Sequence, residues 1–232
     1  MSTSTYERRR SEIETYFDRT ALAAWARMTS DAPLGRIRAT VRAGRDAMRA
    51  SLLAMLPADL TGARLLDAGC GTGALALEAA RRGAHVVGID ISPQLIGIAR
   101  DRAANDAAMA QIEFSAGDML DPSHGRFDYV IAMDSLIHYA QPMVVAALAS
   151  LAPRVDQSIL FTFAPRTPVL ATMHLVGRQF PRSDRAPMIE PLGERALHQA
   201  IRSTPSLSAF SIGRSEKITS GFYVSKALEL RR

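Results

Sequence analysis

The sequence predicts an α/β fold with a seven-stranded, mostly parallel sheet. From Arg64 onward, short β-rich apolar runs alternate with stretches of helical spacing, which is typical of β-α-β units. The chain has 232 residues and 47% of them are hydrophobic, so it can bury one large core. We therefore expect a single α/β domain, with an N-terminal helical arm before it and an insertion after its fifth strand.

The expected elements follow from apolar periodicity and from their boundary residues. Ser92 followed by Pro93 predicts a helix start, because serine caps free backbone N–H groups and proline suits the first helical position. Pro57 predicts the end of the helix before it. The strands are expected at 63–67, 85–90, 112–116, 127–133, 157–164, 207–215 and 221–229. The helices are expected at 37–56, 73–82, 92–105, 141–152 and 191–203, with one or two more within 5–28.

Two segments lie outside this alternation. Residues 1–58 are expected to form a helical arm or lid, since apolar and aromatic side chains recur there at helical spacing. Residues 59–232 then form the main domain. Within it, residues 165–191 contain five prolines and a basic stretch, and we expect this insertion to cover the substrate site.

The chain is basic, with a formal net charge of +5 and an isoelectric point of about 9.9. A positive surface suits an anionic ligand, an acidic membrane surface or nucleic acid, and a solvated surface with a mild bias explains the charge equally well. The sequence has no basic stripe interleaved with aromatic residues of the RNA-binding kind. We therefore expect no nucleic-acid partner and leave peripheral membrane association open.

Cysteine content and hydropathy indicate the compartment. Cys70 is the only cysteine, which excludes an intramolecular disulfide and suits a reducing compartment. The N-terminus lacks the apolar region of a signal peptide, and the longest apolar stretch is too short to span a bilayer. We expect a cytoplasmic protein that is soluble or at most peripheral to a membrane.

A glycine-rich loop follows the first expected strand. Residues 67–73 read Asp-Ala-Gly-Cys-Gly-Thr-Gly and open a helix, and glycine there permits a tight turn and close approach of a ligand to the backbone. The glycines alone are ambiguous, because Gly69, Gly71 and Ala74 also satisfy the dinucleotide fingerprint. Two cofactor classes therefore remain, a dinucleotide and S-adenosylmethionine.

Acidic residues at three strand ends separate these two cofactors. Asp67 stands where a pyrophosphate would be repelled, whereas a sulfonium with an amino-acid tail is tolerated. Asp90 ends the second strand and should accept hydrogen bonds from a ribose, which both cofactors require. Asp118 can take an adenine amino group while Met119 packs on the ring. This third anchor favours S-adenosylmethionine.

Across residues 60–165, this arrangement resembles the class I S-adenosylmethionine-dependent methyltransferases. The resemblance implies the Rossmann-like class I methyltransferase fold, S-adenosylmethionine as methyl donor and S-adenosylhomocysteine as product. The candidate cofactor-binding residues are Asp67, Gly69, Cys70, Gly71, Gly73, Asp90, Ile91, Gly117, Asp118, Met119 and Met133.

The end of the fourth strand and the arm indicate a narrower family. Residues 134–139, Asp-Ser-Leu-Ile-His-Tyr, follow this strand, and this loop faces the methyl donor in the class I fold. Together with Tyr16-Phe17-Asp18, Trp25 and Arg42-Ala-Gly44, they resemble the magnesium-protoporphyrin O-methyltransferases of bacteriochlorophyll synthesis nearly from end to end. The resemblance implies methyl transfer to one propionate carboxylate of magnesium protoporphyrin IX, giving its monomethyl ester. It also implies substrate handover from the magnesium chelatase large subunit and a place peripheral to the photosynthetic membrane.

His138 is the candidate catalytic residue, because an imidazole nitrogen there can orient the propionate. Without the resemblance, a lone histidine at a strand end is more often structural. The propionate is already ionised at neutral pH, so no strong base is expected. Thr29 stands where related enzymes have tyrosine, which leaves a hydroxyl role there in doubt. The candidate substrate-binding residues are Tyr16, Phe17, Trp25, Thr29, Ser135, Tyr139, Arg178 and Arg182.

Aromatic residues of the arm and arginines of the insertion suit a flat macrocycle with two carboxylates. Tyr16, Phe17 and Trp25 could stack on the ring, although an aromatic stripe on an amphipathic helix is as readily core packing. Arginines of the insertion could bind the propionates as charge-assisted pairs or form a solvated basic face. These arginines are Arg166, Arg178, Arg182 and Arg185.

We expect no metal bound by the protein, because the other histidines show no ligand spacing. They are His85, His124, His174 and His198. Magnesium arrives inside the substrate, where His174 is a hypothetical axial ligand. Two alternatives remain open. One is a methyltransferase acting on a quinone or phenol precursor, which would need a base, and the other is a non-catalytic cofactor-binding or nucleic-acid-associated module.

Overall fold

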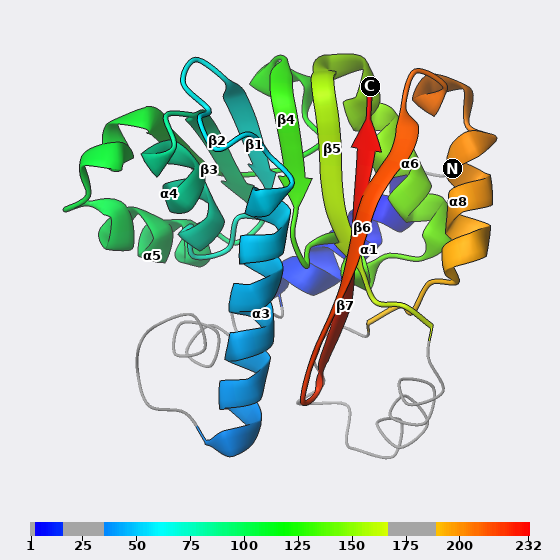
Figure 1. Ribbon diagram of the computed structural model, residues 1–232, viewed down its shortest axis with the longest axis horizontal. Coiled ribbons are helices and arrows are strands. Elements are labelled where there is room, and N and C mark those ends of the chain that lie inside the picture. The colour runs from blue at the N-terminus through cyan, green and yellow to red at the C-terminus, as the bar shows by residue number, and fades with distance from the viewer. Residues whose placement is uncertain (1–2, 16–34, 167–188) are drawn as a thin grey trace.

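One sheet of seven strands forms the centre of the described part of the chain, residues 3–15, 35–166 and 189–232 of the computed structural model (Figure 1). The strand order is β3-β2-β1-β4-β5-β7-β6, with β1 to β5 parallel and β7 antiparallel between β5 and β6. This topology confirms the predicted fold class. The strands are β1 (Arg64–Ala68), β2 (His85–Asp90), β3 (Ile112–Ala116), β4 (Phe127–Ala132), β5 (Val155–Phe163), β6 (Ser211–Ser220) and β7 (Tyr223–Arg231).

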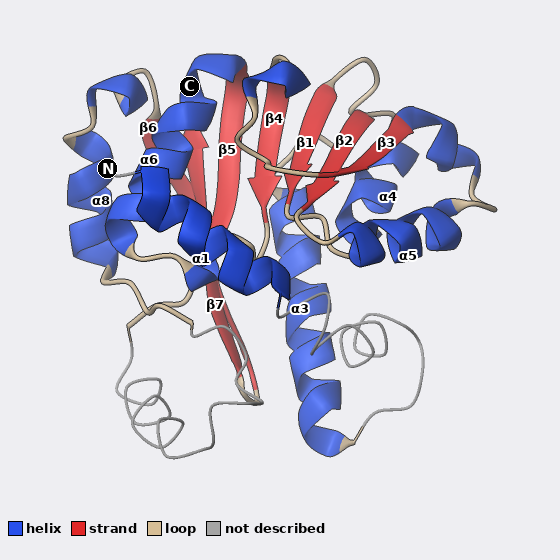
Figure 2. Ribbon diagram, turned by 180° about the vertical axis from the view of Figure 1, so that it is seen from behind, coloured by secondary structure: helices blue, strands red, loops and turns tan. Residues whose placement is uncertain are grey.

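Helices cover both faces of the sheet, as opposite views of the molecule show (Figures 1 and 2). On one face, Met48 of α3 and Ile96 of α5 join a buried apolar cluster, and on the other face Ile13 of α1, Leu148 of α6 and Leu197 of α8 join a second. The α-helices are α1 (Thr3–Thr15), α3 (Arg36–Ala54), α4 (Ala74–Arg81), α5 (Pro93–Ala103), α6 (Gln141–Leu151) and α8 (Glu194–Arg202). Short 3-10 helices are η2 (Ala107–Gln111), η3 (Pro122–His124), η4 (Leu136–His138), η5 (Ala152–Arg154) and η7 (Pro205–Leu207).

Several predicted boundaries are confirmed. The Ser92 hydroxyl accepts a hydrogen bond from the Leu95 backbone N–H at 3.2 Å, and Pro93 occupies the first helical position of α5. Strands β2 and β3 have the predicted limits. Helix α3 ends at Ala54, ahead of Pro57.

The predicted strand over 207–215 is wrong at both ends, because β6 runs from Ser211 to Ser220. Pro205 opens η7, where its fixed φ and missing N–H are tolerated. Leu207 and Phe210, three residues apart, are both buried in the core, which is a helical rather than an alternating spacing.

The predicted arm is partly described. Helix α3 is not separate from the sheet, since Met48 and Leu52 are fully buried in the same apolar cluster as Leu65 of β1. The division of the chain at residue 58 stays a prediction. Most of the predicted insertion falls in 167–188, outside the described residues.

The topology places a crevice at one edge of the sheet. The strand order reverses direction between β1 and β4, and ligands of open α/β sheets bind at the carboxyl ends of strands around such a point. Helix α1 crosses this edge (Figure 2). The residues predicted to bind a cofactor follow these strand ends.

Candidate functional site

A cavity of about 280 Å³ lies at the carboxyl ends of β1, β2, β3 and β4, bordered by α1 and α3. It brings together predicted residues that are up to 72 positions apart, from Asp67 to Tyr139. The predicted residues that line it are Asp67, Gly69, Cys70, Gly71, Asp90, Ile91, Gly117, Asp118, Met119, Met133, Ser135, His138 and Tyr139.

The glycine loop forms the floor of this cavity. Gly69 has a φ of +84°, and a Cβ atom at this position would overlap the Ser135 side chain, so the close approach of the loop after β4 requires glycine. Gly73 does not line the cavity. Its φ is +78°, and a Cβ there would lie 2.7 Å from Phe114 Cζ, so Gly73 lets α4 begin close to β3. Cys70 is buried, and burial raises the pKa of its thiol, which suits a packing residue.

Asp67, at the end of β1, is a buried carboxylate with an unused acceptor. Its residue is 1% exposed, and Oδ2 has no hydrogen-bond partner among the described residues. Burial, followed by the charge of Asp90, raises the pKa of Asp67 to about 7. An ammonium group in the cavity would supply the missing donor and counter-charge, so this position fits the amino-acid end of S-adenosylmethionine.

Asp90, at the end of β2, is held in one orientation by the backbone around it. Its Oδ2 accepts a hydrogen bond from Gly71 N at 2.8 Å, and its Oδ1 accepts one from Ser92 N at 2.9 Å. A carboxylate oxygen can accept more than one hydrogen bond. The side chain is therefore oriented to accept hydrogen bonds from a ribose diol.

Asp118, after β3, connects the cavity to α1. Its Oδ1 accepts a hydrogen bond from Leu120 N at 2.9 Å, and its Oδ2 forms an ion pair with Arg10 at 2.8 Å. On the same helix, Arg9 Nε donates to the backbone oxygen of His138 at 3.0 Å, and Ile13 is buried in the core. Helix α1 thus borders the cavity and contacts the segments that follow β3 and β4.

The loop after β4 also lines the cavity, with Asp134, Ser135, His138 and Tyr139. His138 ends the short helix η4 and is 8% exposed. The Ser135 hydroxyl oxygen is buried and has no hydrogen-bond partner among the described residues. Burial, and next the charge of Asp118, raise the pKa of Tyr139 to about 12, so its phenol stays protonated at neutral pH.

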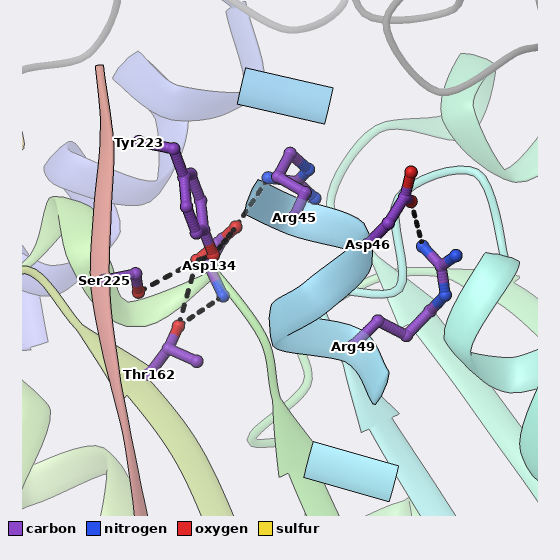
Figure 3. Close-up of polar contacts among 7 residues, drawn as sticks. All are labelled: Arg45, Asp46, Arg49, Asp134, Thr162, Tyr223 and Ser225. Atoms are coloured by element: carbon purple, nitrogen blue, oxygen red, sulfur yellow. Dashed lines mark hydrogen bonds and ion pairs between the residues drawn. The ribbon is translucent and has the colours of Figure 1, made fainter. Parts of the chain in front are cut away.

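Sequence reasoning did not assign four charged residues of α3 to the site. Arg42, Arg45, Asp46 and Arg49 all line the cavity, at the i, i+3, i+4 and i+7 spacing of one helix face. Arg49 forms an ion pair with Asp46 at 2.9 Å, and Arg45 with Asp134 at 2.7 Å (Figure 3). The spacing is visible in the sequence, and it is the signal that could have placed these residues together.

Six predicted substrate-binding residues lie outside the described residues: Tyr16, Phe17, Trp25, Thr29, Arg178 and Arg182. His174 and Arg185 also fall there. Arg166 is exposed, donates its backbone N–H to Leu192 O at 2.9 Å and does not line the cavity. Among the described residues, no group of three or more His, Cys, Asp or Glu side chains could hold a metal ion.

Comparisons with known proteins match both halves of the chain. A family model described as magnesium-protoporphyrin IX methyltransferase C-terminus matches residues 132–232, and a methyltransferase domain model matches residues 65–156. The chain is 47% identical over 229 residues to the magnesium-protoporphyrin O-methyltransferase of Rhodobacter capsulatus, covering 98% of this chain and 99% of that one.

Two crystal structures of magnesium protoporphyrin IX methyltransferase from Synechocystis are similar in fold. The structure with bound S-adenosylhomocysteine has a TM-score of 0.81 at 30% identity and covers 96% of this chain and 99% of that chain. The structure with bound S-adenosylmethionine has a TM-score of 0.78 at 28% identity, with 97% of each chain covered. The likeness therefore extends well beyond the cofactor-binding strands.

Proposed function

The chain belongs to the magnesium-protoporphyrin O-methyltransferase family, and from this premise we propose that it methylates one propionate carboxylate of magnesium protoporphyrin IX. The chain is a methyltransferase that uses S-adenosylmethionine, as its family and its methyltransferase domain indicate. The observation that carries the proposal is that the carboxylates of Asp67, Asp90 and Asp118 line the same cavity as the His138 loop. A methyl donor held by these three carboxylates would face the His138 loop.

The cofactor assignments rest on the geometry of each strand end. In our proposal, Asp67 receives the ammonium group of the donor, Asp90 the ribose hydroxyls, and Asp118 the adenine amino group. Met119, 9% exposed and lining the cavity, packs on the adenine ring. The backbone of Gly69 and Gly71 lets the donor approach β1 closely.

The reaction needs little acid–base machinery. The donor supplies a methyl group on a sulfonium sulfur, an O–CH₃ bond forms as the S–CH₃ bond breaks, and S-adenosylhomocysteine and the methyl ester are released. A propionate is ionised at neutral pH, so no residue must remove a proton. The residues of the cavity act by holding carboxylate and methyl group in line, an effect worth up to about 7–11 kcal/mol in well-oriented reactions.

His138 is the residue that we propose orients the attacking carboxylate. It ends η4, is largely buried and lines the cavity together with the glycine loop. Ser135 and Tyr139 flank it and offer hydroxyl groups to the same substrate. The roles of Tyr16, Phe17, Trp25, Thr29, Arg178 and Arg182 in binding the macrocycle stay predictions, as does the cover formed by residues 165–191.

A panel of acceptors tests the proposed function against its alternatives. The purified chain is incubated with labelled S-adenosylmethionine and with magnesium protoporphyrin, metal-free protoporphyrin or a quinone precursor. We expect magnesium protoporphyrin to be labelled with the highest kcat/KM. Label on the quinone precursor alone would favour a methyltransferase of quinone or phenol precursors. Donor binding without label on any acceptor would favour a non-catalytic module.

We also propose that the chain makes peripheral contact with a membrane. No helix in the described ranges is long and apolar enough to cross a membrane. Ile37 and Phe222 are 60% and 55% exposed, and the hairpin that carries Phe222 packs on α3 through a hydrogen bond from Ser220 Oγ to Thr40 O at 2.8 Å. With exposed Arg36 beside them, these side chains suit peripheral contact with an anionic membrane from the cytoplasmic side.

We further propose that the magnesium chelatase large subunit hands the substrate directly to this chain. It follows from family resemblance and from the low solubility that a flat macrocycle confers. Addition of that subunit, loaded with magnesium protoporphyrin, should raise the rate of methyl transfer above that with free substrate. An unchanged rate would contradict direct transfer.

A further inference from the structure

Asp134 has an unusual backbone conformation at the point where the chain leaves β4. Its φ is +55°, and no other non-glycine residue in the described ranges has a positive φ. The left-handed region costs a non-glycine residue about 1–2 kcal/mol. Such residues persist only where surrounding structure imposes them, and they cluster at functional sites.

A buried polar network holds Asp134 in this conformation (Figure 3). The Thr162 hydroxyl accepts a hydrogen bond from Asp134 N at 2.7 Å and donates one to Oδ1 at 3.1 Å. The Tyr223 hydroxyl lies 3.2 Å from both carboxylate oxygens, and Ser225 Oγ lies 3.4 Å from Oδ1. Burial, and next the charge of Asp134, raise the pKa of Tyr223, so its phenol remains a donor.

The same carboxylate also binds α3. Arg45 Nη1 lies 2.7 Å from Asp134 Oδ2, and the two side chains are only 18% and 3% exposed. Arg45 also lines the cavity. Asp134 therefore joins β4, β5, β7 and α3 at one buried point.

The direction of the chain at Asp134 decides where the following loop lies. Ser135 comes next and packs directly on Gly69, where even a Cβ atom would not fit. His138 follows at the end of η4, and its backbone oxygen accepts a hydrogen bond from Arg9 Nε. A small change at Asp134 would thus move His138 relative to the glycine loop that faces the donor.

We infer that Asp134 is a positioning residue for methyl transfer, which fixes the loop carrying His138 and links it to α3 through Arg45. This inference rests on the role proposed for His138. Stability alone explains the network poorly, because burying a charge carries a desolvation cost that an apolar replacement avoids. Glycine would also allow the turn without strain.

Two substitutions at Asp134 and one control test the inference. Asp134→Gly permits the positive φ but removes the network, and Asp134→Asn keeps the shape but removes the charge that binds Arg45. Tyr223→Phe removes one donor and leaves the carboxylate in place. Asp128→Asn is the matched control, because Asp128 lies on β4, the strand that precedes Asp134, and accepts a hydrogen bond from Arg64 N at 2.8 Å, away from the cavity.

The readouts separate positioning from folding. We expect Asp134→Gly to lower kcat by about 10–100-fold, as small misplacements do, while the calorimetric Kd for S-adenosylhomocysteine changes less than about threefold. The NMR resonances of labelled His138 in the S-adenosylhomocysteine complex should shift in both Asp134 variants and in Tyr223→Phe, but not in Asp128→Asn. The Asn variant should lie between the wild type and Asp134→Gly in kcat.

Unchanged His138 resonances in the Asp134 variants would overturn the inference, as would a kcat in Asp134→Gly equal to that of the wild type. If Asp134→Gly does not fold, the kcat and the His138 resonances of Asp134→Asn and Tyr223→Phe decide the question. The resonance measurement needs no methyl acceptor. A wild-type protein that fails to methylate magnesium protoporphyrin would thus contradict the proposed function without deciding the role of Asp134.

Discussion

Arg10 of α1 and Asp118 after β3 form an ion pair, with Nη1 and Oδ2 2.8 Å apart. The two residues are 108 positions apart, and the pair ties the N-terminal helix to the strand end that we assign to adenine binding. Cofactor binding and the packing of α1 against the cavity should therefore be coupled. The side chains are 37% and 25% exposed, so the coupling should be modest.

Replacing Arg10 by glutamine should weaken binding of S-adenosylhomocysteine by about two- to fivefold, the range expected from a partly exposed ion pair. The effect should decrease at high salt, because ions screen this pair. Calorimetry of Arg10→Gln measures it. Arg8→Gln is the control, since Arg8 is exposed on the same helix. Equal effects of both substitutions would indicate that the loss of positive charge, rather than the loss of the Arg10–Asp118 ion pair, weakens binding.

Asp67 should make the stability of the ligand-free protein depend on pH. Its folded-state pKa of about 7 is above its ordinary 3.8, so the folded protein keeps the proton while the unfolded chain loses it. The free energy of unfolding should fall as pH rises from about 4 to about 7, by up to about 1.4 kcal/mol per pH unit, and level off above. Denaturant unfolding of the wild type and Asp67→Asn measures this, and parallel pH profiles would contradict it.

Cofactor affinity should have the opposite pH dependence. Because the donor's ammonium group favours ionised Asp67, binding of S-adenosylmethionine should strengthen as pH rises toward about 7, at most tenfold per pH unit. Asp67→Asn should bind more weakly above that pH and lose the dependence. A wild-type Kd that is constant between about pH 5.5 and 7 would exclude an ionic contact at Asp67.

Removal of the His138 imidazole should reduce turnover more than binding. His138→Ala should lower kcat by about 100-fold if the ring orients the propionate, with Kd for S-adenosylmethionine nearly unchanged. His138→Gln, which retains a hydrogen-bonding group, should retain more activity than His138→Ala. His85→Gln serves as the control, because His85 is exposed at the start of β2. A kcat in His138→Ala similar to that of the control would refute the role.

The exposed pair Ile37 and Phe222 should contribute to membrane contact. Replacing both by serine should reduce co-sedimentation with vesicles that contain anionic lipid, because apolar insertion and charge attraction act together. Neutral vesicles should bind both proteins weakly. Undiminished binding of the double variant to anionic vesicles would indicate another contact surface.

Local sequence patterns are sufficient to predict the parallel strands and the acidic residues at their carboxyl ends. Apolar runs locate the carboxyl ends of the first four strands to within one residue, so the sequence alone places Asp67, Asp90 and Asp118 on one edge of the sheet, where they line the cavity. Parallel strands make this inference safe, because their carboxyl ends share an edge. The resemblance in residues 134–139 then identifies the loop after β4, which lines the same cavity.

Long-range polar contacts could not be predicted. Arg10 and Arg45 resemble any surface arginine in sequence, and only the fold brings them to Asp118 and Asp134. Helix spacing could have shown that Arg45 shares a face with Arg42 and Arg49, but not which face is buried. The left-handed conformation of Asp134 likewise depends on Thr162 and β7, which follow it in the chain.

Identifying the bond that carries the transferred methyl group tests the central claim most directly. Wild-type protein is incubated with methyl-labelled S-adenosylmethionine and magnesium protoporphyrin, and the porphyrin is analysed by mass spectrometry before and after mild alkaline hydrolysis. The account predicts one labelled methyl group per porphyrin, released by alkali as labelled methanol, because an ester is base-labile. A porphyrin without label, or a label that resists alkali, would contradict it.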